Sequence, residues 1–215
     1  MQISPAELPW QAVYRLLIGA VLPRPIGWVS SVNPAGQPNL APFSFFTIAS
    51  ANPPHVLFCP MVRTVDSQPK DTLRNIRQTG EFVVNIATRP LAEAVNLTAA
   101  ELPADVDEFE FAGLSTLPSA LVRPPRVALS PVHFECTLAH ILDLGDQPGA
   151  GSVVVGRVVM LHIDEAVMVD GNKIDLARLQ PIGRLSGSAY CQVTETFNLE
   201  RPPSRLSPPI HPENR

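Results

Sequence analysis

Charged side chains are scarce in this sequence. Asp, Glu, Lys and Arg make up 17% of the 215 residues, against about 25% in a typical soluble chain. The formal net charge is −4, and only two of the basic residues, Lys70 and Lys173, are lysines. Domains that bind nucleic acids usually carry a basic stripe on their surface. This charge balance therefore argues against nucleic acid as a partner.

Cysteine is also rare, and Cys59, Cys136 and Cys191 lie far apart with no CxxC pair. An odd number of separated cysteines argues against a disulfide framework and against a zinc ribbon. The five histidines fall at neither HxH nor HExxH spacings, so we expect no metal site. The sequence has no GxSxG motif, which removes the usual signature of a nucleophilic hydrolase.

One long stretch has no charged side chain at all, because every position from Pro25 to Val62 lacks Asp, Glu, Lys and Arg. A membrane-spanning helix needs about 20 successive apolar residues, but six further prolines interrupt this stretch. We therefore expect no membrane span. The first ten residues contain no basic residue and no long apolar run, unlike a signal peptide, so we expect a cytoplasmic protein.

Proline is abundant, with 24 residues in 215, about twice the usual share. That content disfavours long helices. The length and the 45% hydrophobic content suit one compact domain, which we place at residues 1–200. Five prolines between Pro202 and Pro212 exclude a helix or a central strand from the tail, residues 201–215. We expect this tail to form an extended arm, either disordered or laid across a neighbouring subunit.

Most of the body has the pattern of β-strands. Runs rich in β-branched and apolar residues predict strands over 26–32, 40–50, 56–62, 82–87, 132–144, 152–164 and 189–197. Helical spacing predicts short helices over 71–78 and 91–101. Turn residues at 33–36 predict a hairpin between the first two strands. The sequence therefore favours a mainly β fold, a closed antiparallel barrel that leaves no sheet edge exposed.

The uncharged stretch also carries side chains that could bind a cofactor. Hydroxyl and amide groups lie beside aromatic rings in it, and Arg24, Arg63 and Lys70 stand at or just beyond its ends. An apolar, aromatic wall with a few polar groups and a cationic end suits a flat cofactor with a phosphate tail. An ordinary barrel core, whose Ser and Thr side chains bond to the backbone, has the same pattern. The residues alone leave both interpretations open.

Five segments, taken in order, resemble a known family. They are RPIGWVSSVNPAGQPNLAPFSFF (24–46), ANPPHVLF (51–58), KDTLRNI (70–76), GEFVVNIA (80–87) and PIGRLSGSAY (181–190). Together they are similar to the flavin reductase-like, FMN-binding split-barrel family, and the similarity extends from Pro23 to Phe197. This resemblance implies a six-stranded antiparallel split β-barrel with Greek-key character and a few short helices. It also implies a homodimer with FMN near the subunit interface.

The resemblance implies an activity as well. Family members pass hydride from NAD(P)H to flavin, and the reduced flavin serves a partner monooxygenase or another acceptor. Because FMN itself carries the hydride chemistry, no catalytic acid or base is required, and we assign no catalytic side chain. Two alternatives stay open: a non-catalytic FMN electron carrier of the flavoredoxin kind, and a split-barrel module for another ligand such as pyridoxal phosphate or haem.

The flavin contacts are carried over from the family residue by residue. Ser30 and Ser31 match contacts at a strand end, residues 42–45 match the segment along the ring and ribityl chain, and residues 70–72 match the phosphate end. The full set of expected cofactor-binding residues is Arg24, Trp28, Ser30, Ser31, Pro42, Phe43, Ser44, Phe45, Lys70, Asp71, Thr72, Arg184 and Tyr190.

Physical chemistry narrows some of these roles. Lys70 can supply positive charge to a phosphate, and Thr72 can supply a hydroxyl hydrogen bond. Asp71 would repel a phosphate, so we expect it to accept from amides or to cap the helix that starts at Thr72. Arg24 either reaches the phosphate or braces its loop by an ion pair. Trp28 is either a core aromatic or stacks on the ring.

Two residues near the end of the domain complete the predictions. Ser186 stands where the family pattern RLGG…Y usually has a glycine, and a side chain there narrows the approach of the backbone to a ligand. His162, near the end of its predicted strand, is either a structural histidine or a proton donor, because a pKa near 6.5 suits both roles.

Overall fold

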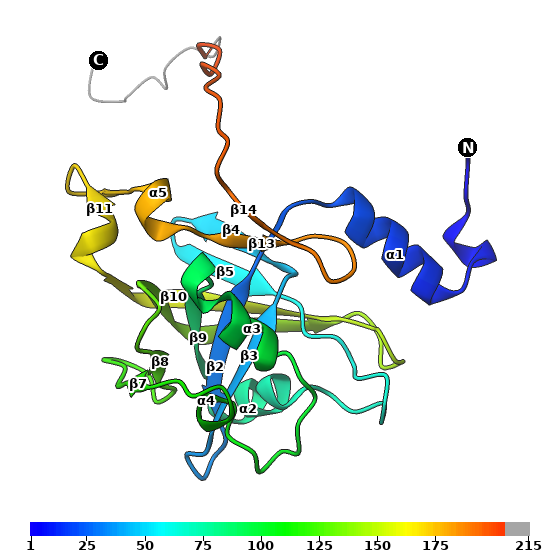
Figure 1. Cartoon of the computed structure of the whole chain (residues 1–215). Coiled ribbons are helices and arrows are strands. Elements are labelled where there is room, and N and C mark those ends of the chain that lie inside the picture. The colour runs from blue at the N-terminus through cyan, green and yellow to red at the C-terminus, as the bar shows by residue number, and fades with distance from the viewer. Residues whose placement is uncertain (205–215) are drawn as a thin grey trace, which may run out of the picture.

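A computed structural model of the chain describes residues 1–204. Its main sheet has seven strands (Figure 1). In spatial order they are β3 (Pro38–Phe43), β2 (Gly27–Val32), β6 (Glu81–Ile86), β9 (Val132–Asp143), β10 (Ser152–Ile163), β5 (Pro54–Phe58) and β4 (Phe46–Ala51). Every neighbouring pair in this order is antiparallel.

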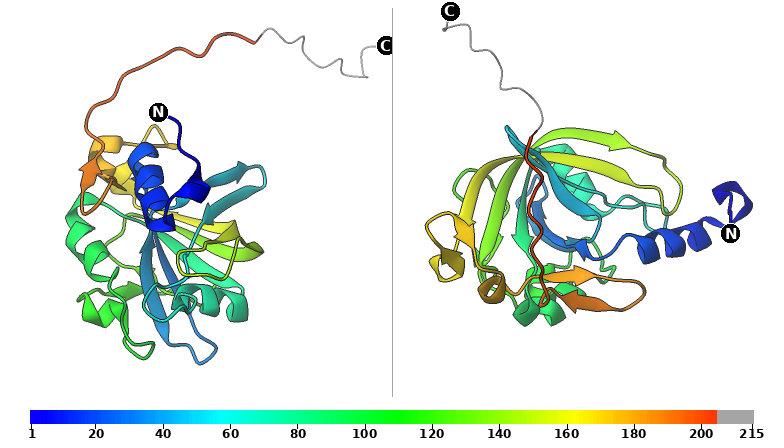
Figure 2. Two further views of the ribbon diagram at one scale, coloured as in Figure 1. Left: turned by 90° about the vertical axis from the view of Figure 1, so that its right-hand side faces the viewer. Right: turned by 90° about the horizontal axis from the view of Figure 1, so that it is seen from above.

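The two edge strands of this sheet follow one another in the chain. β3 ends at Phe43 and β4 begins at Phe46, yet they lie at opposite ends of the strand order. The sheet must therefore curl until its ends approach each other, as the view from above shows (Figure 2). No ladder joins β3 to β4 within residues 1–204, so the barrel stays open along this line. A mainly β, split-barrel fold is thereby confirmed.

The strand count differs from the six expected because one predicted strand is two. Residues 40–50 bend at Ser44 and Phe45 and form the ends of β3 and β4. The bend lets consecutive strands occupy the two edges of the open barrel. A second irregularity lies at His140, which pairs with Val155 while Leu138 pairs with Gly156. This β-bulge places an extra residue on β9 where the alternating pattern is interrupted.

Large apolar side chains fill the barrel. The rings of Phe58 and Phe82 meet edge to face, with centroids 5.4 Å apart. Gly156 makes room for them, because a Cβ there would collide with the Phe82 ring. Gly27 has the same role beside Phe46, whose ring would lie 2.8 Å from a Cβ at that position. The close approach of Gly27 on β2 to Phe46 on β4 packs the open side of the barrel.

A helix covers one part of the barrel, and smaller helices pack on its outer face. α2 (Asp71–Thr79), predicted over 71–78, buries Leu73 and Ile76 in the barrel core. A second apolar cluster lies outside β2, where Trp28 packs beneath 3₁₀ helix η2 (Arg89–Leu91), α3 (Ala92–Leu97) and α4 (Glu108–Phe111). The predicted helix over 91–101 is thus shorter than expected.

The remaining elements are short. β1 (Arg24–Pro25), β13 (Ile182–Arg184) and β14 (Tyr190–Gln192) form a three-stranded sheet, so the strand predicted over 189–197 has only three residues. Two-residue strands form the hairpins β7 (Thr116–Leu117) with β8 (Arg126–Val127), and β11 (Met168–Val169) with β12 (Lys173–Ile174). Short helices complete the chain: η1 (Pro5–Glu7), η3 (Glu165–Val167) and α5 (Leu176–Leu179).

The longest helix was not predicted. α1 (Trp10–Ala20) projects beside the barrel (Figures 1 and 2) and buries only Ile18. The prolines that argue against long helices lie elsewhere, and Pro9 precedes its first turn, where no backbone donor is needed. No helix in the described part of the chain is long and apolar enough to cross a membrane. Most of the predicted arm, residues 205–215, lies outside the described residues, and the boundary at residue 200 stays a prediction.

Candidate functional site

The bend between β3 and β4, residues 42–45, separates two cavities. We call this bend the β3–β4 corner. An apolar cavity of about 490 Å³ lies on one side, with Arg24, Ser44 and Phe45 in its lining. A narrow cavity of about 40 Å³ lies on the other side, lined by Pro42, Phe43, Lys70 and Asp71 among others. The fold thus brings seven of the expected cofactor-binding residues to one corner from three segments of the chain.

Apolar side chains make most of the larger cavity. Leu17 of α1, and Val21 directly after this helix, line it together with Phe45 and Leu57. Cys59 also lines this cavity, and burial raises the pKa of its thiol. The thiol is therefore neutral at physiological pH. A concave, apolar surface with few polar groups suits a flat aromatic ring.

The start of α2 forms the cationic end of the site. Lys70 directly precedes the helix, and its carbonyl accepts from the amides of Leu73 and Arg74 at 3.0 and 3.1 Å. Within residues 1–204, the amides of Asp71 and Thr72 have no hydrogen-bond acceptor. The N-terminal end of a helix carries a partial positive charge. Free amides beside a lysine form a donor set that suits a phosphate group.

Carboxylates form ion pairs with the cations at this end of the site. Lys70 Nζ lies 3.5 Å from Glu101 Oε1, and both side chains are about one-third exposed. Arg63 Nη1 lies 3.2 Å from Asp71 Oδ2, and Asp71 also bonds to Arg74. Asp71 therefore does not cap α2, contrary to expectation, because two arginines hold its carboxylate. A phosphate bound to Lys70 would replace Glu101, and a partly exposed ion pair of this kind opposes such replacement only weakly.

Arg24 is buried and holds three segments together. Its Nη1 donates to the carbonyls of Ile18 and Val21 at 2.8 and 3.1 Å, and its Nη2 donates to Leu185 O at 2.9 Å. Its Nε lies 3.4 Å from Ser44 Oγ. Burial lowers the pKa of the Arg24 guanidinium. Of the two roles expected for Arg24, the structure has the one in which it braces its loop. It does so by hydrogen bonds to carbonyls and not by an ion pair, since Arg24 makes none in the described part of the chain.

Thr72, expected at the phosphate end, and Ser31, expected to contact the flavin from a strand end, lie in a buried polar network. Thr72 Oγ1 donates to Asn39 Oδ1 at 2.8 Å, and Ser31 Oγ lies 3.4 Å from the same oxygen. Asn39 Nδ2 in turn donates to Glu108 Oε1 at 2.8 Å, and burial raises the pKa of the Glu108 carboxyl. The side chains of Ser31 and Thr72 face the protein interior in this conformation. Their flavin contacts stay predictions.

Trp28 and Ser30 are also fully buried. The indole Nε1 of Trp28 donates to Thr98 Oγ1 at 2.8 Å, and its ring belongs to the outer apolar cluster. Ser30 Oγ donates to Pro125 O at 2.5 Å. Of the two roles considered for Trp28, the structure has the core aromatic, because no face of the ring is open to a ligand. A flavin contact by Ser30 stays a prediction.

Comparison with known proteins identifies the family. Residues 19–173 match the model of the flavin reductase like domain. The chain belongs to the flavin reductase-like family. An uncharacterized protein of Halalkalibacterium halodurans is 41% identical over 94% of this chain and 97% of its own length.

Two solved structures are similar over nearly the whole chain. Nitrilotriacetate monooxygenase component B from Bacillus cereus is 37% identical, with a TM-score of 0.87 over 93% of this chain and 98% of its own. The 2-nitrobenzoate 2-nitroreductase NbaA from Pseudomonas fluorescens is 32% identical, with a TM-score of 0.83 over 95% of this chain and all of its own. Family members are oxidoreductases, and membership assigns this chain flavin-related redox chemistry.

A flavin fits the residues at the β3–β4 corner. The apolar cavity suits its ring system, and the donors at the start of α2 suit its phosphate. The comparisons leave the choice between FMN and FAD open. Within residues 1–204, no group of three or more His, Cys, Asp or Glu side chains is arranged to hold a metal ion.

Arg184 and Tyr190 line neither cavity at this corner, although Arg184 pairs with Arg24 across β13 and β1. The Arg184 guanidinium stacks 4.4 Å above the Tyr190 ring. Tyr190 lines a different cavity, of about 750 Å³, between α3 and β14. At the tip of the β13–β14 hairpin, Ser186 Oγ lies 3.8 Å from the position of a Cβ at Gly19, so this tip contacts α1. The flavin contacts of Arg184 and Tyr190 stay predictions.

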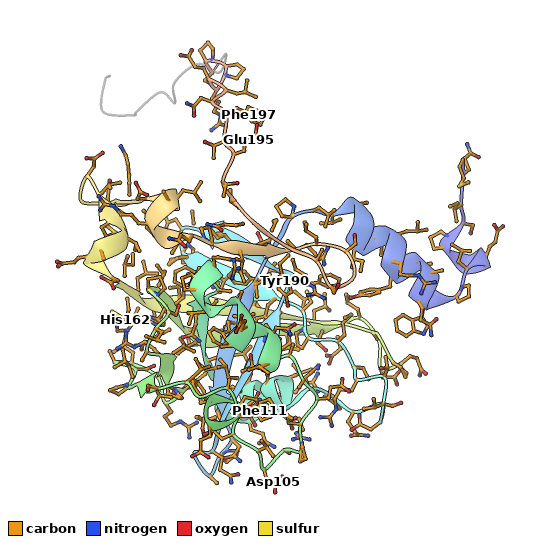
Figure 3. All side chains as sticks on the ribbon, viewed as in Figure 1. Asp105, Phe111, His162, Tyr190, Glu195 and Phe197 are labelled. Atoms are coloured by element: carbon orange, nitrogen blue, oxygen red, sulfur yellow. The ribbon has the colours of Figure 1, made fainter. Side chains whose placement is uncertain are left out.

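His162 belongs to another part of the molecule, on the side of the barrel away from α1 (Figure 3). Its Nε2 lies 2.5 Å from Oε1 of Glu135, which is fully buried. Burial opposes ionisation of Glu135, but the amides of Ala120 and Leu121, each at 2.6 Å, and His162 lower its pKa. The two amides tie the loop before β8 to β9, so this cluster has the structural role considered for His162.

The sequence missed three residues at the site. Glu101 pairs with Lys70 although the two are far apart in the sequence, and no local pattern marks it. Leu17 of α1 and Val21 directly after it line the apolar cavity, and only the prediction of that helix could have placed them. Arg63, by contrast, was marked by its position at the end of the uncharged stretch.

Proposed function

We propose that this protein binds FMN at the β3–β4 corner and reduces it with NAD(P)H. One observation carries the proposal: residues 42–45 separate an apolar cavity from a cationic helix start. A flavin mononucleotide has the same two-ended character, with an apolar ring system and a phosphate. Family membership supports a flavin as the ligand.

The residues at the corner would bind and orient the cofactor. The ring would lie on the apolar wall that includes Phe45 and Leu57, beside the Ser44 hydroxyl. The phosphate would take the place of Glu101 at Lys70, near the free amides of Asp71 and Thr72. Bound FMN supplies the hydride chemistry, and the protein positions it and excludes bulk water. Because the flavin supplies the hydride chemistry, the site needs no catalytic acid or base.

We further propose that the reduced flavin or its electrons pass to a monooxygenase or another acceptor protein in the cytoplasm. The similar Bacillus cereus structure is a monooxygenase component B, which supports a partner enzyme of this kind. A homodimer is part of the same proposal, because Leu17 on α1, Val21 directly after it and Ile48 on β4 are 58%, 60% and 71% exposed. Exposed large apolar side chains of this kind suit a subunit interface. Sedimentation of a monomer at micromolar concentration would argue against the dimer.

The proposed activity has a direct test. The protein is mixed with FMN without oxygen, NADH or NADPH is added, and the flavin absorbance is followed at about 450 nm. We expect the absorbance to bleach with at least one donor, faster than in the absence of protein. No acceleration with either donor would contradict the proposal. Bound FMN that takes electrons from a reduced protein donor, and ignores NAD(P)H, would instead support the electron carrier.

A further inference from the structure

A second ligand-sized cavity lies beside the cationic end of the site. It has a volume of about 430 Å³, within the range of roughly 300–1,000 Å³ of small-molecule sites. α1 forms one wall, with Trp10, Tyr14 and Arg15, and the chain after β5 forms the opposite wall. Arg63 and Lys70 line both this cavity and the narrow cavity at the β3–β4 corner. A ligand whose phosphate lies at Lys70 could therefore continue into the second cavity.

The aromatic wall of this cavity is held in place. The indole of Trp10 lies against Gly149, where a Cβ would come within 2.7 Å of the ring. Gly149 also has a φ of +85°, a conformation that side chains with a Cβ rarely adopt. Trp10 is nevertheless 43% exposed, so part of its ring stays open. Purine bases stack on such rings.

One cation at this cavity has no partner in the described part of the chain. The side chain of Arg15 is exposed and makes no ion pair or hydrogen bond within residues 1–204, whereas the carboxylate of Glu101 holds Lys70, and Asp66 and Asp71 hold Arg63. An arginine guanidinium presents a fork of donors that matches phosphate oxygens. Trp10 and Arg15 thus place a stacking surface and a free phosphate-binding group on the same helix.

We propose that this cavity binds the adenosine monophosphate half of a dinucleotide. The adenine would stack on Trp10, and Arg15 would bind a phosphate. The adenosine monophosphate could belong to FAD, continuing from the flavin phosphate at Lys70, or to NAD(P)H. The link to the flavin phosphate rests on the proposed function, but the binding of adenosine monophosphate alone does not.

Calorimetric titration with AMP, FMN and FAD tests the inference. We expect AMP to bind the wild-type protein at one site per chain. Trp10→Ala and Arg15→Gln should each weaken AMP binding about tenfold and leave FMN binding within about twofold. Trp10→Phe should keep most of the AMP affinity, because a benzene ring also stacks. Arg157→Gln is the charge-matched control, since Arg157 is exposed on β10 and lines neither cavity.

Experiments with the dinucleotides distinguish FAD from NAD(P)H as the source of the adenosine monophosphate. If the cavity takes the adenosine end of FAD, the wild type should bind FAD more tightly than FMN, and Trp10→Ala should remove the difference. If it takes the adenosine end of NAD(P)H, Trp10→Ala and Arg15→Gln should raise the KM for that donor and leave kcat unchanged. No AMP binding at millimolar concentration, or AMP binding that both variants leave unchanged, would overturn the inference. FMN binding and reduction would then still stand, so the two failures are distinguishable.

Discussion

Arg24 and Lys70 are both cations beside the β3–β4 corner, but their partners differ in kind. Arg24 is 5% exposed and donates to three backbone carbonyls. Lys70 pairs with the carboxylate of Glu101, and both side chains are partly exposed. A backbone carbonyl cannot leave without moving its segment, whereas an exposed carboxylate can rotate into water at small cost. The comparison indicates that Arg24 holds the architecture of the site and that Lys70 is the cation available to a ligand.

The largest effect should follow from removing Arg24. Arg24→Ala leaves the carbonyls of Ile18, Val21 and Leu185 without their donor, and unpaired buried acceptors are costly. We expect the free energy of unfolding to fall by about 2–3 kcal/mol, measured by urea denaturation. Arg157→Ala, at an exposed arginine that makes no ion pair within residues 1–204, is the control and should change stability by less than about 0.5 kcal/mol. Equal effects of the two substitutions would remove the distinction between Arg24 and a surface arginine.

Lys70 should show the opposite pattern, with an effect on binding and little on stability. Lys70→Ala breaks only a partly exposed ion pair, so the free energy of unfolding should change by less than about 1 kcal/mol. FMN binding should weaken by about 1.5–3 kcal/mol, the scale of a charge-assisted hydrogen bond, in a flavin fluorescence titration. Lys173→Ala is the matched control, because Lys173 lies in the β11–β12 hairpin. Unchanged FMN affinity in the Lys70 variant would reject Lys70 as the phosphate anchor.

The contrast between these residues also shows what could be predicted from the sequence. α2, β6, β9 and β10 begin and end within about two residues of their predicted bounds, because alternation and helical spacing are local properties. The division of residues 40–50 into β3 and β4 could not be predicted in this way, because closure of the barrel causes the bend. α1 was missed because the proline content of the whole sequence argued against long helices, although no proline lies within Trp10–Ala20.

The candidate site could also be predicted only in part from the sequence. Family resemblance placed Pro42, Phe43, Lys70 and Asp71 in one region, and the fold brings them together around the narrow cavity. Resemblance could not show which polar groups already have partners, since those partners come from distant segments. The backbone carbonyls that accept from Arg24 are partners from distant segments. Asn39, which accepts from Thr72, is another. Family resemblance therefore placed these residues together, and tertiary contacts decide which of their groups are free to bind.

The smallest effect, and the one of opposite sign, should come from Glu101. Glu101→Gln removes the carboxylate that competes with a phosphate for Lys70 and keeps the size of the side chain. We expect FMN binding to strengthen by about 0.5–1 kcal/mol, the upper range for a partly exposed ion pair, and the gain to disappear in the Lys70→Ala background. Glu93→Gln changes the net charge equally but lies on α3 beside the cavity of Tyr190, so it controls for long-range attraction. A gain in Glu93→Gln as large as in Glu101→Gln would mean that net charge, and not the carboxylate at Lys70, sets the affinity.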